Sequence, residues 1–215
     1  MSGSKYFKHL LVLGGAALLF GGTLSAQEGS RFAFSAGGGW TEPVSNTGRN
    51  LDRGWNIAGG GGMNFNRYFS TMIDLGYTHM GINSSSLSNA GFPGGGVNVF
   101  SATVDPVFRV NPGHHVEGYI IGGAGLYRVT REFTQPSLAT FTNFNPFFGF
   151  YNVTVPTTEI LDSYTINKPG LNIGAGFTVG TRWRGKFFGE ARYNRIFIGN
   201  DRHFDYVPVT FGFRW

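Results

Sequence analysis

The residues that could support chemistry are eight charged side chains set among alternating apolar and small residues. They are Asp74, Asp105, Arg109, Glu117, Arg182, Glu190, Arg192 and Arg214. The acidic residues are spread over different segments, with no cluster at the spacing of a metal site. Buried charges persist only when they are paired and hydrogen-bonded. Ion pairing is therefore the chemistry we expect of this set.

Other residues give no support for catalysis. Four histidines follow residue 26, and we interpret them as solvated or interfacial: His79, His114, His115 and His203. The glycine runs at 59–62 and 94–96 lack the Gly-Lys-Ser/Thr ending of a phosphate-binding loop. We interpret the first run as packing space and the second as a loop. We therefore expect no catalytic residue, no metal site and no cofactor.

The elements that must position the charged residues are strands. Eight segments alternate in hydrophobicity with period 2, which predicts β-strands with two different faces. Their approximate ranges are 31–41, 54–66, 69–80, 97–110, 115–129, 170–183, 186–198 and 207–215. Segment 115–129 is apolar or glycine on both faces. We place Glu117 on the inner face there, because the preceding short turn would then bring it near Arg109.

The last segment predicts how the sheet closes. Its apolar set alternates with Pro208, Thr210, Gly212 and Arg214, and consists of Val207, Val209, Phe211, Phe213 and Trp215. A terminal strand left unpaired exposes a row of backbone groups, and pairing with the first strand removes both edges. The sequence therefore predicts an all-β fold, an eight-stranded antiparallel up-and-down β-barrel.

The links between strands alternate in length. Three tight links (66–68, 111–114, 184–185) alternate with four long ones (42–53, 81–96, 130–169, 199–205). Short links at one end, long links at the other and an even strand number are typical of transmembrane barrels. A soluble lipocalin-like barrel is the alternative, since it would alternate equally well with its apolar face inward.

Composition favours the membrane barrel. Aromatic residues lie at strand ends on the apolar face, as in the girdles at the two membrane interfaces. The opposite face carries the charged set, which suits a polar lumen. Charged residues make up only 13% of the chain, and there is no cysteine. No basic cluster is present, so we expect no nucleic-acid binding.

The first 26 residues predict export. Lys5 and Lys8 precede an apolar run from Leu10 to Phe20, and Leu24-Ser25-Ala26 precedes Gln27. This order is typical of a secretory signal peptide, with cleavage after Ser25 or an uncleaved anchor helix as alternatives. We expect domains at 1–26 (signal peptide) and 27–215 (barrel). Cleavage would lower the net charge from +5 to +3.

Several motifs resemble a known family. Gly-Ala-Gly-Phe at 174–177, Phe-Gly-Glu-Ala-Arg-Tyr at 188–193 and the terminal Phe-Gly-Phe-Arg-Trp are similar to those of small outer-membrane β-barrel proteins. The OmpA-like barrel domain and the OmpX group are the nearest named relatives, and the resemblance covers essentially 28–215. It implies residence in the outer-membrane lipid bilayer of a Gram-negative-type envelope. It also implies insertion by the β-barrel assembly machinery, which reads the terminal strand, here Phe211, Phe213 and Trp215.

The family hosts adhesins, membrane anchors and small pores. We expect a structural or surface-interaction (adhesin-like) protein, its lumen plugged by an interior network in which Glu190 can reach Arg182 and Arg192. A narrow porin-like channel is the first alternative. A lipid-modifying enzyme is the second, although no His-x-Ser pair of the lipid A deacylase kind occurs.

The link 130–169 is the segment in which we expect function. It is too aromatic for a disordered tether, with Phe141, Phe144, Phe147, Phe148, Phe150 and Tyr151. Two interpretations remain open: the flanking strands run on as a hairpin packed by these rings, or the rings form an exposed patch that binds an extracellular ligand.

Overall fold

The computed structural model describes residues 31–90, 93–147, 149–180, 185–199 and 202–215. The expected signal peptide lies outside these ranges. No helix in this part of the chain combines the length and the hydropathy needed to cross a membrane.

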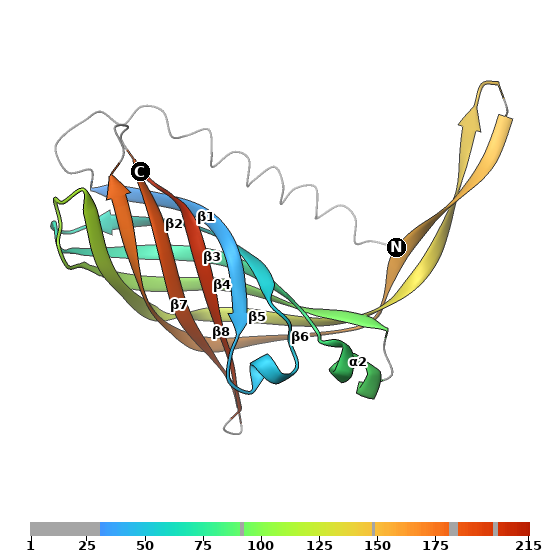
Figure 1. The fold of residues 1–215 in the computed structure, drawn as a ribbon, viewed down its shortest axis with the longest axis horizontal. Helices are drawn as coiled ribbons and strands as arrows, with labels where there is room; N and C mark the ends of the chain where they lie inside the picture. The colour runs from blue at the N-terminus through green and yellow to red at the C-terminus, as the bar shows by residue number, and fades with distance from the viewer. Residues whose placement is uncertain (1–30, 91–92, 148, 181–184, 200–201) are drawn as a thin grey trace. The chain divides into compact units, whose positions relative to one another are not determined.

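The eight predicted strands form a closed antiparallel barrel in chain order (Figure 1). They are β1 (Phe32–Pro43), β2 (Gly54–Asn64), β3 (Phe69–Gly81), β4 (Gly94–Arg109), β5 (Val116–Asn145), β6 (Gly149–Gly180), β7 (Lys186–Gly199) and β8 (Arg202–Arg214). A 3₁₀ turn η1 (Thr47–Arg49) and a short helix α2 (Ser84–Ala90) lie in the first two long links. The prediction of an eight-stranded up-and-down barrel is confirmed.

The seam between the first and last strands closes as the terminal alternation predicted. Ala36 lies opposite Phe213, and Trp40 lies opposite Val209. Phe34 and Trp215 exchange both backbone hydrogen bonds, at 2.8 and 2.9 Å. Closure leaves no edge in the barrel wall at which another chain could pair.

The apolar face points outward, which excludes the lipocalin-like alternative. Ile73, Phe108 and Phe187 are more than half exposed, as are other apolar residues that alternate with inward polar ones. Glu117 and Tyr119 are buried inside, which settles the ambiguous orientation of β5. An outward apolar surface of this extent requires a lipid environment.

The interior is layered. Toward the long-link end, β3, β4, β5, β7 and β8 contribute an apolar cluster that includes Met80, Val99 and Tyr127. A smaller cluster toward the short-turn end contains Met72, Val107 and Ile121. The charged network described below lies between them. Thus the expected polar lumen is a polar middle layer bounded by apolar ones.

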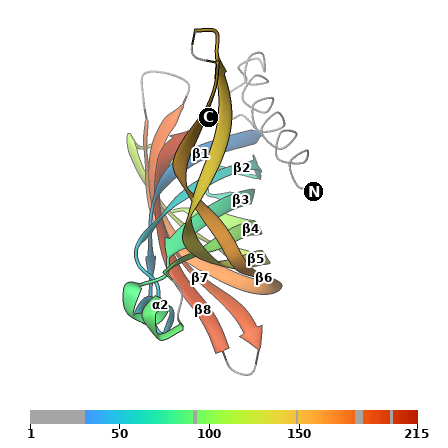
Figure 2. The ribbon, with the colours of Figure 1, turned by 90° about the vertical axis from the view of Figure 1, so that its right-hand side faces the viewer.

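Two of the expected long links are largely strand. β4 pairs with β5 as far as Thr134, and β6 pairs with β7 from Gly170 onward. Beyond these points β5 and β6 pair only with each other, from Gln135–Glu159 to Asn145–Gly149. The result is a two-stranded hairpin that continues past the other strands (Figures 1 and 2). This is the first of the two interpretations of link 130–169.

The prediction of a long link at 199–205 is wrong. β7 continues to Gly199 and β8 begins at Arg202. Phe204 and Tyr206 continue the inward alternation of β8 and are buried, at 3% and 2% exposed. Burial of these two rings in the apolar cluster stabilises strand structure in a segment that we expected to be a link.

Candidate functional site: a lumen ion-pair network and an aromatic hairpin

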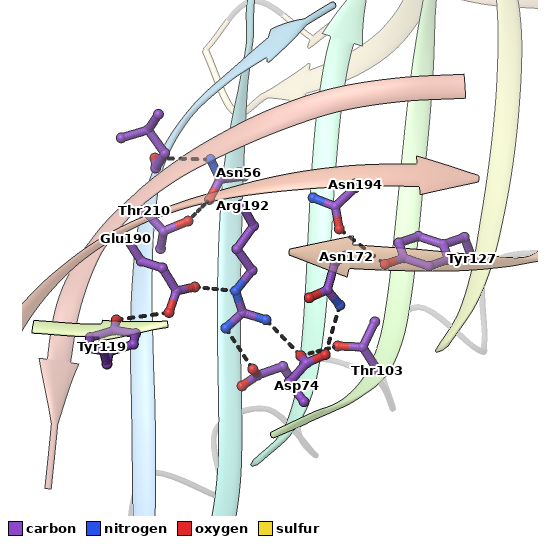
Figure 3. Close-up of polar contacts among 12 residues, drawn as sticks. Asn56, Asp74, Thr103, Tyr119, Tyr127, Asn172, Glu190, Arg192, Asn194 and Thr210 are labelled. Carbon is purple, nitrogen blue, oxygen red and sulfur yellow. Dashed lines mark hydrogen bonds and ion pairs between the residues drawn. The ribbon is translucent and has the colours of Figure 1, made fainter. Parts of the chain in front are cut away.

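Arg192 on β7 is the centre of the lumen network (Figure 3). Its Nη2 donates to Asp74 Oδ2 and its Nη1 to Asp105 Oδ2, each at 2.7 Å. Its Nε donates to Glu190 Oε1. One guanidinium group thus bridges carboxylates from β3, β4 and β7, which links strands on opposite sides of the barrel.

Neutral groups complete the carboxylates' hydrogen bonds. Asp105 accepts from Thr103 Oγ1 at 2.6 Å and from Asn172 Nδ2 at 2.8 Å. Glu190 accepts from the Tyr119 hydroxyl at 2.8 Å. A buried charge is stable only when its remaining lone pairs are satisfied, and these donors contribute to that for Asp105 and Glu190.

Glycines in the wall make room for these large side chains. A Cβ atom at Gly60 would overlap Asp74 Oδ1, and one at Gly174 would press on the backbone of Ala191 and the side chain of Arg192. Both glycines point inward beside the network. Within the run at 59–62, Gly60 thus provides packing space, as the sequence suggested.

A second polar contact fastens the seam. Asn56 on β2 donates to the Trp40 carbonyl at 2.8 Å, and the Thr210 hydroxyl on β8 donates to Asn56 Oδ1 at 2.8 Å. These side chains therefore connect β2 to β8 across β1 (Figure 3).

The structure brings together four of the eight predicted charged residues: Asp74, Asp105, Glu190 and Arg192. Arg214 stacks on the rings of Tyr119 and Phe188, at 4.9 and 5.3 Å. Arg182 lies outside the described residues.

We expected Glu117 to lie near Arg109, but within the described ranges these two residues form no hydrogen-bonded ion pair with each other. Glu117 instead accepts from Lys186 Nζ at 2.6 Å and from the Gly113 N–H at 2.9 Å. Arg109 donates to Asn64 Oδ1 at 2.8 Å. Lys186 is the first residue of β7 and pairs with Gly180 on the neighbouring strand β6. Sequence reasoning missed it because only the strand register places it over Glu117.

The network leaves little open space. A cavity of about 60 Å³ lies beside it, lined by residues that include Asp74, Asn172, Glu190 and Arg214. This volume is enough for a small number of water molecules.

The candidate surface loop forms the end of the β5–β6 hairpin. Phe144 and Phe150 are cross-strand partners with ring centroids 5.0 Å apart. Phe147 lies in the turn and is 90% exposed. Phe148 and the side chains of Phe141 and Tyr151 lie outside what the structure describes. The described rings therefore gather at the tip.

The three residues of the expected assembly signal lie on the outer face of the seam. The ring centroids of Trp40 and Phe211 are 5.7 Å apart, and those of Phe213 and Trp215 are 6.2 Å apart. Trp215 also lies 6.4 Å from Phe34. The terminal aromatics thus face the lipid as part of the outward belt.

Two of the four predicted solvated or interfacial histidines make polar contacts with nearby oxygen atoms. The ring Nδ1 of His79 lies 2.7 Å from Asn98 Oδ1, and that of His114 lies 3.2 Å from the Asn111 carbonyl. In the described ranges, no three His, Asp or Glu residues are grouped as a metal site requires.

An eight-stranded closed barrel with an apolar outer belt and a polar middle layer defines the class of small transmembrane β-barrels. The model of the outer membrane protein beta-barrel domain family matches residues 14–215. The chain belongs to this family, and its strands cross an outer-membrane bilayer.

Three solved structures are similar to this chain. Neisserial surface protein A (NspA) is 16% identical with a TM-score of 0.57, covering 87% of this chain and 98% of that one. Ail of Yersinia pestis, solved with the heparin analogue sucrose octasulfate, is 22% identical (TM-score 0.46, 86% and 100% covered). The N-terminal barrel of Pseudomonas aeruginosa OprF is 12% identical (TM-score 0.41, 87% and 100%). No curated protein matches.

Proposed function

We propose that this protein is a surface-interaction, adhesin-like barrel, in which a plugged transmembrane body displays the β5–β6 hairpin outside the cell. The observation that carries the proposal is the hairpin itself. From Gln135 to Asn145, β5 pairs with β6 and lies beyond Gly94–Thr134, the last pair between β4 and β5. Its exposed tip rings are available to a ligand.

The interior supports this proposal over a channel. Asp74, Asp105 and Glu190 converge on one guanidinium group, and apolar clusters lie on either side of the network. The remaining cavity is far smaller than a solute path. The narrow pore remains the alternative, favoured only by this cavity. A steady planar-bilayer conductance of the purified protein would support the pore and overturn the plugged barrel.

Export and assembly complete the proposal. Residues 1–26 direct secretion and are removed, and the assembly machinery inserts the chain by reading its terminal aromatic strand. The protein performs no catalysis. Mass spectra of outer-membrane lipid from cells with and without the gene test this last statement, because a lipid-modifying enzyme would change them.

The proposed function is tested by removing the hairpin. Replacement of Thr134 to Ser163 with a short Gly-Ser linker leaves the ring of eight strand pairings intact, so the variant is expected to insert as a heat-modifiable barrel. Cells that display it should lose binding to cultured cells or matrix proteins that the parent binds. Undiminished binding would refute the role of the hairpin, and failed insertion would show that the segment belongs to the barrel.

A further inference from the structure

The hairpin tip carries the residue type that the barrel itself turns toward lipid. Phe144, Phe147 and Phe150 are 58%, 90% and 77% exposed, whereas Phe187 in the bilayer-facing belt is 61% exposed. Phe147 and Phe150 are therefore more exposed than this belt ring, and Phe144 is nearly as exposed. Rings so exposed in water are stabilised when a membrane interface covers them.

Charged residues are absent from the tip of the hairpin and lie at its base. The sequence from Phe133 to Thr158 contains no Asp, Glu, Lys, Arg or His, whereas Arg131, Glu132, Glu159 and Asp162 lie at its base. A surface that recognises a polyanion or an acidic protein needs basic groups. The tip offers none, so an uncharged, apolar partner is the one it matches.

The backbone limits how deeply the hairpin can enter lipid. Beyond Thr134, the described part of β5 pairs with β6 alone, and no other described strand pairs with its second edge. Such edges are not stable in the hydrocarbon core. The rings at the turn can instead enter the interfacial layer, which apolar side chains penetrate to roughly 5–10 Å.

The reach of the hairpin decides which bilayer it meets. The register runs from Thr134–Ile160 to Asn145–Gly149, which spans roughly 37 Å at about 3.4 Å per residue. This length is added beyond Gly94, the residue at which β4 begins, and it projects past the ends of the other strands (Figure 1).

From these observations we propose that the hairpin tip docks on an apposed lipid bilayer with uncharged or zwitterionic headgroups by shallow insertion of Phe144, Phe147 and Phe150. The inference rests on the proposed surface-interaction function and names its partner. Attachment then needs no specific receptor protein, and it is insensitive to ionic strength because no ion pair contributes.

The test uses the full barrel refolded into nanodiscs, with phosphatidylcholine vesicles as the probe. Co-flotation of nanodiscs with vesicles should be equal at 0.05 and 0.5 M salt. The triple variant Phe144→Ser, Phe147→Ser and Phe150→Ser should bind at least tenfold less, because three rings lose their apolar transfer. Empty nanodiscs should not bind the vesicles. The variant Ile160→Thr, at an exposed position about 33 Å from the tip along the strand, should bind like the parent.

The absence of cysteine permits a second measurement. A polarity-sensitive dye on Phe147→Cys should shift to the blue when vesicles are added, while the same dye on Ile160→Cys should not. A blue shift in nanodiscs before any vesicle is added would place the tip on its own bilayer and overturn the inference.

The remaining outcomes separate this inference from the proposed function. Vesicle binding that is unchanged in the triple variant would refute tip insertion. If vesicles do not bind but deletion of the hairpin abolishes attachment to cells, the partner is not lipid and the proposed function stands. If neither vesicles nor cells bind, both fail.

Discussion

Substitution of Arg192 by Gln should be the most damaging single change in the lumen. The guanidinium group makes three charge-assisted hydrogen bonds, to Asp74, Asp105 and Glu190. Asp105 would keep Thr103 and Asn172 as donors, and Glu190 would keep Tyr119. The three negative charges would nevertheless face one another without a cation between them. Breaking a buried ion pair by removing one partner costs about 3–5 kcal/mol, and we expect a loss in this range.

The chain offers a matched control for burial. Arg53 forms an ion pair with Glu42 at 2.7 Å, the same distance as the pair of Arg192 with Asp74. Its side chain is 67% exposed, against 17% for Arg192. Arg53→Gln should therefore cost no more than about 1 kcal/mol.

The assay is equilibrium urea unfolding of the barrel in phospholipid vesicles, followed by tryptophan fluorescence and by the heat-dependent gel shift. Glu190→Ala should also destabilise, by roughly 3–5 kcal/mol if its surroundings are dry. A double-mutant cycle with Asp74→Asn and Arg192→Gln should give a coupling energy well above the scatter of distant pairs, about 0.3–0.5 kcal/mol. Equal stability losses for Arg192→Gln and Arg53→Gln would refute the reasoning, because burial would then contribute nothing.

Three further predictions concern packing, assembly and export. Gly60→Val should displace Asp74 and lower the unfolding free energy by about 1–3 kcal/mol, whereas Gly59→Val, whose Cβ meets only Ser35 O at 3.6 Å, should change it little; equal losses in urea titrations would contradict the packing argument. Deletion of Trp215 removes both backbone bonds to Phe34 and the terminal aromatic, so immunoblots should show outer-membrane levels falling far more than synthesis; normal membrane levels would disprove an assembly role. Mass spectrometry of the purified mature protein should find Gln27 as the first residue, and an intact Met1 would contradict cleavage.

The strands and their faces were predictable because a barrel wall imposes a simple repeat. Each inward residue is followed by an outward one, so Phe211, Phe213 and Trp215 could be assigned to one face from sequence alone. The charged residues of the opposite face then indicated that this face meets lipid. The rule fails where both faces carry similar residues. On β5 only the burial of Glu117 and Tyr119 decides the orientation.

The partners within the network could not be predicted from sequence. Arg192 and Asp74 are 118 residues apart, and they meet because strand tilt and stagger bring β3 across the lumen from β7. A side chain's face follows from alternation, but its height in the barrel follows from the register of every intervening strand. For the same reason Glu117 hydrogen-bonds to Lys186, while nearby Arg109 forms its hydrogen bond with Asn64.

Packing constrains the side chains of the hairpin less than it constrains those of the barrel. Inside the barrel, Gly60 and Gly174 are fixed by the side chains they accommodate, and the charged residues by their partners. Between Thr134 and Asn145 the pairing is with β6 alone, so no lumen and no neighbouring strand β4 constrains the side chains. A solvent-exposed segment under no such constraint usually gathers charge, because charged residues favour solubility. The tip is uncharged and rich in Phe, although packing inside the barrel does not require these residues there. A binding surface therefore explains this composition better than a role in folding does.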